Sequence, residues 1–108
     1  KWMDGFAPMG PCLATADELG DPENLGIRLR LNGETMQEDN TGSMIWGVAD
    51  IIEYVSAILT LEPGDVISMG TPGGVGFART PPRDLQPGDV VEAEIDGIGL
   101  LANPVEAE

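Results

Sequence analysis

The clearest candidate for chemistry in this sequence is a glycine-rich stretch at residues 70–76, Gly-Thr-Pro-Gly-Gly-Val-Gly. Glycine tolerates positive φ angles and lets the backbone approach a ligand without a Cβ atom in the way. The Thr71 hydroxyl, together with N–H groups of such a loop, can bind an oxyanion such as a carboxylate. Runs of glycine and proline also form ordinary turns, so the residues alone leave both interpretations open.

This glycine-rich stretch fits no standard nucleotide-binding motif. A phosphate-binding P-loop requires a lysine directly after its last glycine, whereas Phe77 follows Gly76 here. The dinucleotide spacing Gly-x-Gly-x-x-Gly is also absent. The preceding apolar run, Val66–Met69, predicts a buried strand that leads into the stretch.

A row of acidic residues is the second candidate. Glu92, Glu94 and Asp96 alternate along a predicted strand, so their side chains share one face. A Glu-x-Glu pair supplies the oxygen ligands that Mg²⁺ and Ca²⁺ prefer. The residues between them are apolar, as in a plain half-buried strand of an acidic protein. We therefore interpret the row as a solvated strand face.

The composition excludes several classes of function. Five basic and nineteen acidic residues give a net charge of −14, which argues against a nucleic-acid partner or an anionic membrane. The absence of histidine removes Ser-His and Cys-His catalysis and His-ligated zinc from the chain's own repertoire. The single cysteine, Cys12, cannot form an internal disulfide, which favours a reducing compartment, and we expect the cytoplasm.

Periodicity and turn residues predict one small, strand-rich domain with one main helix. Apolar residues recur at helical spacing over residues 48–59. Asn32-Gly33 and Asp96-Gly97 are hairpin turn sequences, each lying between two runs that alternate like strands. The predicted strands cover residues 25–31, 35–38, 90–95 and 98–102, with a further short strand at 12–15 and a helical turn at 15–19.

In their order along the chain, several short motifs resemble the C-terminal part of the catalytic domain of the fumarylacetoacetate hydrolase family. The most specific block is residues 60–67 followed by residues 70–76. The other matching motifs are Lys1-x-x-Asp4-Gly5-Phe6-Ala7-Pro8, Thr15–Glu18, Asn32-Gly33-Glu34, Gln37, Gly88–Val91 and Gly97–Gly99. The ordered set spans nearly the whole chain, which makes it more specific than any one motif.

This resemblance implies a β-rich α+β fold, a mixed β-sandwich roll of the family's catalytic-domain type with one main helix at about residues 48–59, and usually a homodimer. It implies a metal-dependent enzyme that acts on acylpyruvates, 2-oxo acids or related β-dicarbonyl compounds by C–C hydrolysis, decarboxylation, hydration or isomerisation through an enolate. The implied metal is Mg²⁺ or Mn²⁺, with Ca²⁺ as a further option. The implied substrate is a small molecule with a carboxylate.

The same resemblance assigns roles to three residues. Lys1 is the implied catalytic residue, beside the metal and the substrate oxygens. Gly70 and Thr71 are the implied substrate-binding residues, which hold a carboxylate or oxo group. A cation and an ammonium group would stabilise the enolate, and a threonine on a glycine loop would fix the far end of the acid.

The resemblance also has a gap at the metal site. The family holds its metal with a Glu-x-Glu pair and an Asp that lie upstream of the lysine segment, and Glu92 and Glu94 are in the wrong place to replace them. We therefore expect residues 1–105 to be the C-terminal portion of one catalytic domain, followed by a short tail at residues 106–108, with the metal ligands upstream. The 108 residues alone are then expected to be inactive. The alternatives are a non-catalytic structural or dimerising fragment and a small anion-binding module.

Overall fold

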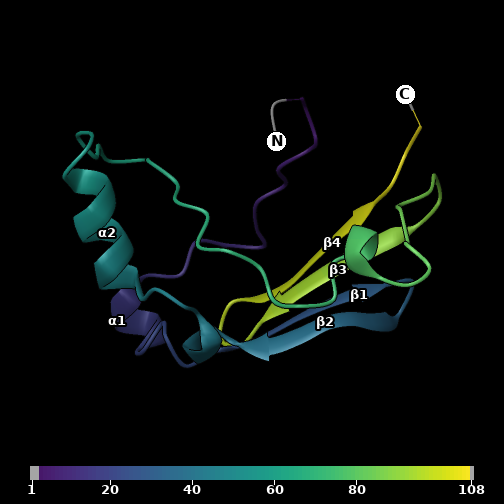
Figure 1. Cartoon of the computed structure of the whole chain (residues 1–108), viewed down its shortest axis with the longest axis horizontal. Coiled ribbons are helices and arrows are strands. Elements are labelled where there is room, and N and C mark those ends of the chain that lie inside the picture. The colour runs from purple at the N-terminus through teal and green to yellow at the C-terminus, as the bar shows by residue number, and fades with distance from the viewer. Residues whose placement is uncertain (1–2, 108) are drawn as a thin grey trace.

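The structure, a computed structural model of the whole chain, describes residues 3–107. Its centre is a four-stranded antiparallel sheet with the strand order β2-β1-β3-β4 (Figure 1). The strands are β1 (Gly26–Leu31), β2 (Glu34–Asn40), β3 (Val90–Ile95) and β4 (Gly99–Pro104). The α+β class predicted from the sequence is confirmed, and the strands of the described residues form this one sheet.

Both predicted hairpins are present. Asn32 and Gly33 have φ angles of 52° and 82°, the positive pair that joins two twisted antiparallel strands in a two-residue turn. The second turn contains Gly97 with a φ angle of 78° and joins β3 to β4. The central contact between β1 and β3, in which Ile27 lies opposite Ile95, then joins the two hairpins into one sheet.

The two α-helices of the described residues lie at one end of the sheet (Figure 1). The main helix is α2 (Val48–Ser56), a short turn of helix is α1 (Ala16–Leu19), and 3₁₀ turns cover Thr41–Ser43 and Gly76–Ala78. The predicted helix at residues 48–59 is thus confirmed, but it ends at Ser56, and beyond it Ile58 N and Leu59 N both donate to the same carbonyl, Val55 O. The Glu23 carboxylate accepts from Val48 N at 2.7 Å and so caps the start of α2. None of the described helices is long and apolar enough to cross a membrane.

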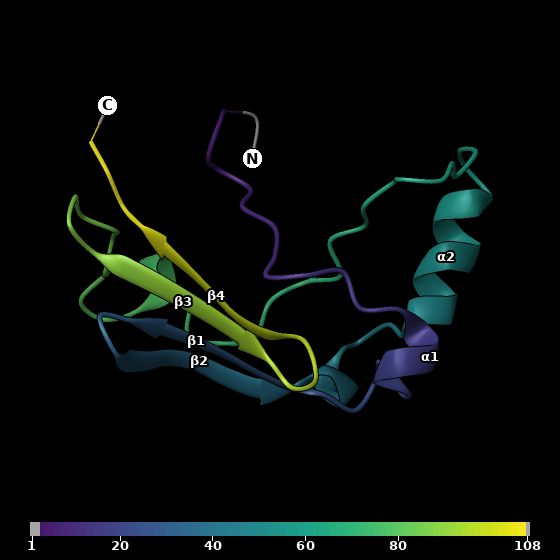
Figure 2. The ribbon, with the colours of Figure 1, turned by 180° about the vertical axis from the view of Figure 1, so that it is seen from behind.

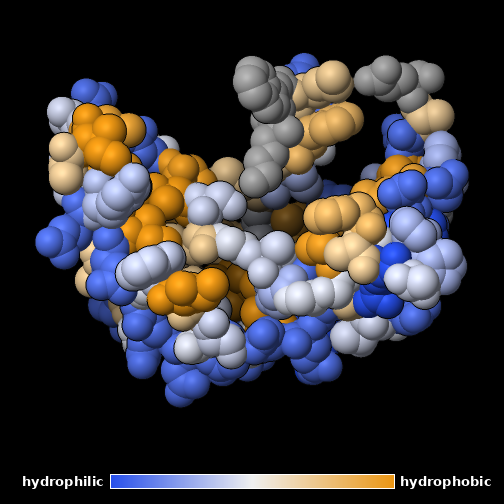
Figure 3. All heavy atoms as spheres, viewed as in Figure 1, coloured by the Kyte–Doolittle hydropathy of each residue, from blue (hydrophilic) through white to orange (hydrophobic). Residues whose placement is uncertain are grey.

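Apolar side chains remain largely exposed. Leu31, at 6% exposure, is the one buried apolar side chain among residues 3–107. Helix α2 stands beside the end of the sheet rather than over its face, as the front and rear views agree (Figures 1 and 2). Ile52 of α2, and Ile58 and Leu59 just after the helix, are accordingly exposed, and apolar surface gathers over this arm of the molecule (Figure 3).

Two strand predictions are wrong. Residues 66–69 and residues 12–15 are extended but belong to no strand, and Val66 is 71% exposed. A strand requires a neighbouring strand to accept and donate its backbone hydrogen bonds, and residues 66–69 run outside the four-stranded sheet. The apolar run therefore identifies a segment with exposed apolar side chains, not a strand of this sheet.

Candidate functional site

The glycine-rich loop, defined as residues 70–76, lies against strand β2. Gly70 has a φ angle of 134° and Gly74 has one of 101°, both in the region that favours glycine. A Cβ atom on Gly74 would lie 2.3 Å from Met36 O, so the loop can approach β2 this closely only with glycine at that position. The sequence of the loop thus sets how near it comes to the sheet.

Gln37 on β2 binds the first half of the loop. Its side-chain Nε2 donates to Thr71 Oγ1 at 2.9 Å and to Pro72 O at 2.6 Å, and the residue is only 9% exposed. A carbonyl oxygen can only accept, so the amide NH₂ must face the loop. Thr71 Oγ1 therefore accepts from Gln37, and its own hydrogen is left to point toward another acceptor. Because Thr71 is exposed, that acceptor can belong to a ligand.

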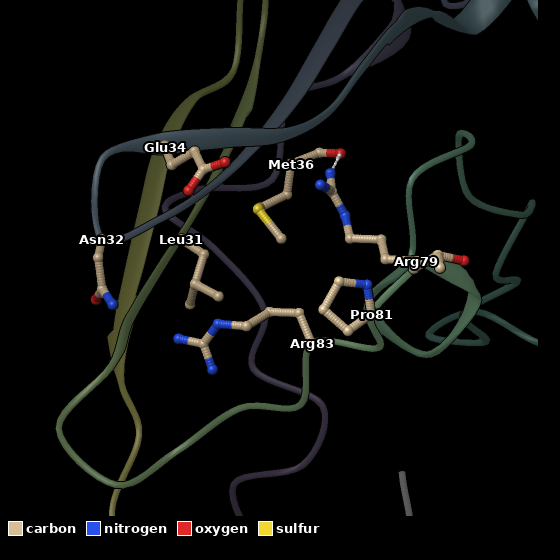
Figure 4. Close-up of a pocket in the computed structure, with 8 residues that line it drawn as sticks. Leu31, Asn32, Glu34, Met36, Arg79, Pro81 and Arg83 are labelled. Carbon is tan, nitrogen blue, oxygen red and sulfur yellow. Dashed lines mark hydrogen bonds between the residues drawn. The ribbon is translucent and has the colours of Figure 1, made fainter.

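Arg79 binds the second half of the loop. Its Nε donates to Gly74 O at 2.9 Å, and its Nη2 donates to Met36 O at 2.5 Å, the contact drawn as a dashed line in Figure 4. The guanidinium thus bridges the loop and the backbone of β2. Gln37 and Arg79 together hold the loop to one strand at two points.

A hollow of about 340 Å³ lies beside Arg79 (Figure 4). Its lining residues are Leu31, Asn32, Glu34, Met36, Arg79, Thr80, Pro81 and Arg83, and they include neither Gly70 nor Thr71. Both of its arginines already have partners, Arg79 on backbone carbonyls and Arg83 on the Asp89 carboxylate at 2.9 Å. We therefore assign the hollow no part in binding an anionic substrate.

Asp89 stabilises the sheet at the end of β1 that leads into the β1–β2 turn. Its carboxylate accepts from Asn32 Nδ2 at 2.8 Å, from Gln86 N at 2.9 Å and from Arg83. The hydrogen bond from Asn32, then that from Gln86 and the charge of Arg83, hold the pKa of Asp89 below its ordinary value of 3.8. The residue is buried, and its bonds tie the β1–β2 turn to the turn before β3. We assign it a structural role.

One member of the acidic row, Glu94 on β3, faces the arginines of β1. Glu94 forms an ion pair with Arg30 and lies 3.5 Å from Arg28, whose other partner is Glu38 on β2. These contacts occupy the carboxylate of Glu94 with cations of the same sheet. Among residues 3–107, no three His, Cys, Asp or Glu side chains come together as a metal site.

Two of the three residues that the resemblance assigns to the site lie within the described residues. Lys1 lies outside the described residues. Gly70 and Thr71 lie side by side at the start of the loop, with the Thr71 hydroxyl oriented as described above. Gln37 and Arg79 were given no role from the sequence. The only sequence signal for Gln37 was its place among the family motifs, and none pointed to Arg79.

Comparison with known proteins identifies the relatives of this chain. The C-terminal domain of fumarylacetoacetate hydrolase matches residues 1–106. The mitochondrial oxaloacetate tautomerase of Xenopus laevis is 50% identical over 105 residues, which is 97% of this chain and 33% of that protein. The chain therefore spans about a third of the length of the curated relatives it matches.

Solved structures that resemble this chain point to the same family. Fumarylacetoacetate hydrolase from Exiguobacterium antarcticum superposes with a TM-score of 0.94 at 46% identity, covering 98% of this chain and 38% of that one. Maleylpyruvate hydrolase from Sphingobium sp. SYK-6, solved with manganese(II) and pyruvate, gives a TM-score of 0.81 at 36% identity, covering 90% and 34%. The match along nearly the whole chain, in sequence and in fold, places it in the fumarylacetoacetate hydrolase family.

Proposed function

We propose that this chain is the C-terminal part of a metal-dependent enzyme that acts on 2-oxo acids, and that its glycine-rich loop binds a substrate carboxylate or 2-oxo oxygen. The observation that carries the proposal is the orientation of Thr71. Its oxygen accepts from Gln37, so its hydrogen is available to a negatively charged oxygen. Two of the relatives named above are named for reactions of oxaloacetate and maleylpyruvate, which are both 2-oxo acids.

Oxaloacetate tautomerisation is the reaction that we propose to test first. In the enol-to-keto direction, the hydroxyl at C2 loses its proton, C3 gains one, and the C2 oxygen carries negative charge in between. A hydroxyl donor and loop N–H groups directed at that oxygen or at the neighbouring carboxylate would stabilise this charge. They would also hold the acid in one orientation.

The proposal includes a divalent metal, and we place its ligands outside the described residues. Within those residues no three-ligand cluster exists, and Glu94 is engaged by arginines. Mg²⁺ or Mn²⁺, with Ca²⁺ as the further option, would supply positive charge for the enolate. The solved relative that contains manganese supports this choice. We keep Lys1 as the proposed catalytic residue on the basis of its motif.

A second candidate is a structural or dimerising role without catalysis. The observation in its favour is the exposure of apolar side chains across α2 and residues 58–66, a surface that suits contact with other protein. We further propose a homodimer, and a cytoplasmic location because of the single cysteine. The related oxaloacetate tautomerases of Xenopus laevis and Rattus norvegicus are named as mitochondrial proteins, so the mitochondrial matrix is the alternative location.

The test uses the complete polypeptide that carries this chain, stripped of metal and then reloaded with Mg²⁺ or Mn²⁺. We expect loss of the enol absorbance of oxaloacetate, or hydrolysis of an acylpyruvate, that depends on the added metal. The isolated 108 residues serve as the matched control and are expected to be inactive. A folded, metal-loaded protein that acts on none of these acids would overturn the enzymatic proposal and favour the structural role.

A further inference from the structure

Gln37 is the buried polar side chain that contacts the loop. It lies at 9% exposure in the middle of β2, whereas Glu38 and Asp39 after it are exposed. A buried amide is retained where its hydrogen bonds are satisfied, and both partners of its NH₂ belong to the loop, Thr71 Oγ1 and Pro72 O. From this geometry, and resting on the proposed function, we infer that Gln37 is a positioning residue that sets the Thr71 hydroxyl as a donor to the substrate.

The reason lies in the competition for the Thr71 hydrogen. A hydroxyl can donate to one group and accept from others, and it rotates to suit its neighbours. Thr71 Oγ1 and Pro72 O both lie within hydrogen-bond distance of the same nitrogen, so they lie near each other. Without the Gln37 amide, the Pro72 carbonyl would lose its donor and the Thr71 hydroxyl would be free to turn toward acceptors of its own loop. Gln37 satisfies the carbonyl and occupies one lone pair of the hydroxyl oxygen, so the hydrogen is directed away from Gln37 and is left for an acceptor outside the loop.

The position of the loop itself has separate support. Arg79 joins Gly74 O to Met36 O without any contribution from Gln37. The close approach at Gly74 likewise depends on the glycine and not on the amide. A change at Gln37 is therefore expected to alter the direction of one hydroxyl while leaving the loop on β2.

The test combines Gln37→Met, which keeps the length of the side chain and removes the donor, with Thr71→Val in a double-mutant cycle. Gln37→Met alone should raise KM for the 2-oxo acid about three- to tenfold with kcat nearly unchanged, the size of one ordinary hydrogen bond. In the Thr71→Val background the same change should raise KM by less than about twofold, because its effect is exerted through Thr71. Gln86→Met is the matched control, since Gln86 is exposed and lies outside the loop contacts.

Binding of pyruvate to the metal-loaded protein, measured by calorimetry, gives a readout that does not need turnover. It should weaken in parallel with the rise in KM. Equal effects of Gln37→Met in both backgrounds would mean that Gln37 acts on stability or on another group, and would overturn the inference.

If Gln37→Met does not fold, Gln37→Glu takes its place. This variant keeps the shape of the side chain and replaces the donor by an acceptor, and unchanged pyruvate binding in it would overturn the inference as well. Absence of any 2-oxo acid activity or pyruvate binding in the unaltered protein would instead count against the proposed function and, with it, this inference.

Discussion

Replacing Thr71 by valine is the sharpest test of the glycine-rich loop. Valine keeps the branched shape of threonine and removes the hydroxyl, so the backbone at residue 71 need not change. In the complete enzyme we expect the variant to bind its 2-oxo acid more weakly. The folded structure should be nearly unchanged, since Gln37 retains its bond to Pro72 O at 2.6 Å.

The effect of Thr71→Val on substrate binding and its effect on the free energy of unfolding can be estimated separately. Loss of a hydrogen bond to a charged group costs about 1.5–3 kcal/mol, which corresponds to a rise of about ten- to a hundredfold in KM. Loss of the contact from Gln37, a neutral pair at 2.9 Å, should lower the free energy of unfolding by about 0.5–1.5 kcal/mol. The catalytic effect should therefore exceed the effect on stability.

Steady-state kinetics at saturating metal, together with a thermal melt of each variant, separates these effects. If the contact is positional, KM rises before kcat falls. Thr60→Val is the matched control, because Thr60 is exposed and lies outside the loop. A folded, metal-binding Thr71→Val enzyme with unchanged kinetics would remove the loop from the substrate site. A drop in stability with normal kinetics would make Thr71 a residue of the turn and no more.

Three further predictions follow from particular contacts. Gly74→Ala would place a Cβ 2.3 Å from Met36 O at a φ angle of 101°, so we expect it to cost about 1–3 kcal/mol in a urea unfolding experiment; a variant as stable as the parent would contradict the close approach. The isolated 108 residues should show no tight, saturable Mg²⁺ or Mn²⁺ binding by calorimetry, and a tight site would promote Glu92, Glu94 and Asp96 to ligands. The pKa of Asp89 is lowered in the folded state, so its stabilising effect is present above the ordinary value of 3.8 and is lost as the pH falls through the lowered pKa. Asp89→Asn should therefore flatten the loss of stability in that acidic range, and an unchanged pH profile would refute the assignment.

Features governed by neighbouring residues were predictable from the sequence. Asn32-Gly33 specifies a turn through the φ angles it permits, and the alternating runs on either side pair because the turn brings them together. The helix followed from its apolar spacing, but its end at Ser56 depends on hydrogen bonding in the last turn. The pairing of β1 with β3 joins residues far apart in sequence, and no turn motif specifies it.

The contacts that shape the candidate site were not predictable in the same way. Gln37 and Thr71 are 34 positions apart, and Arg79 reaches Met36 over 43 positions. Nothing in the local pattern of either segment specifies that they meet. The failed strand at residues 66–69 has a related cause, because an apolar run indicates burial but does not identify the group that provides it.

These observations divide the proposed active site into two parts with different physical origins. The loop half depends on contacts that lie within residues 3–107: the Gln37 amide, the Arg79 bridge and the glycine at position 74. The bridge and the glycine hold the loop on β2, and the Gln37 amide donates to Thr71, whether or not the exposed apolar surface of α2 is covered. The metal half has no counterpart among the described residues, where no three-ligand cluster exists and Glu94 of the acidic row is paired with arginines. The loop should therefore keep its geometry in a metal-free protein, while catalysis should require the metal half as well.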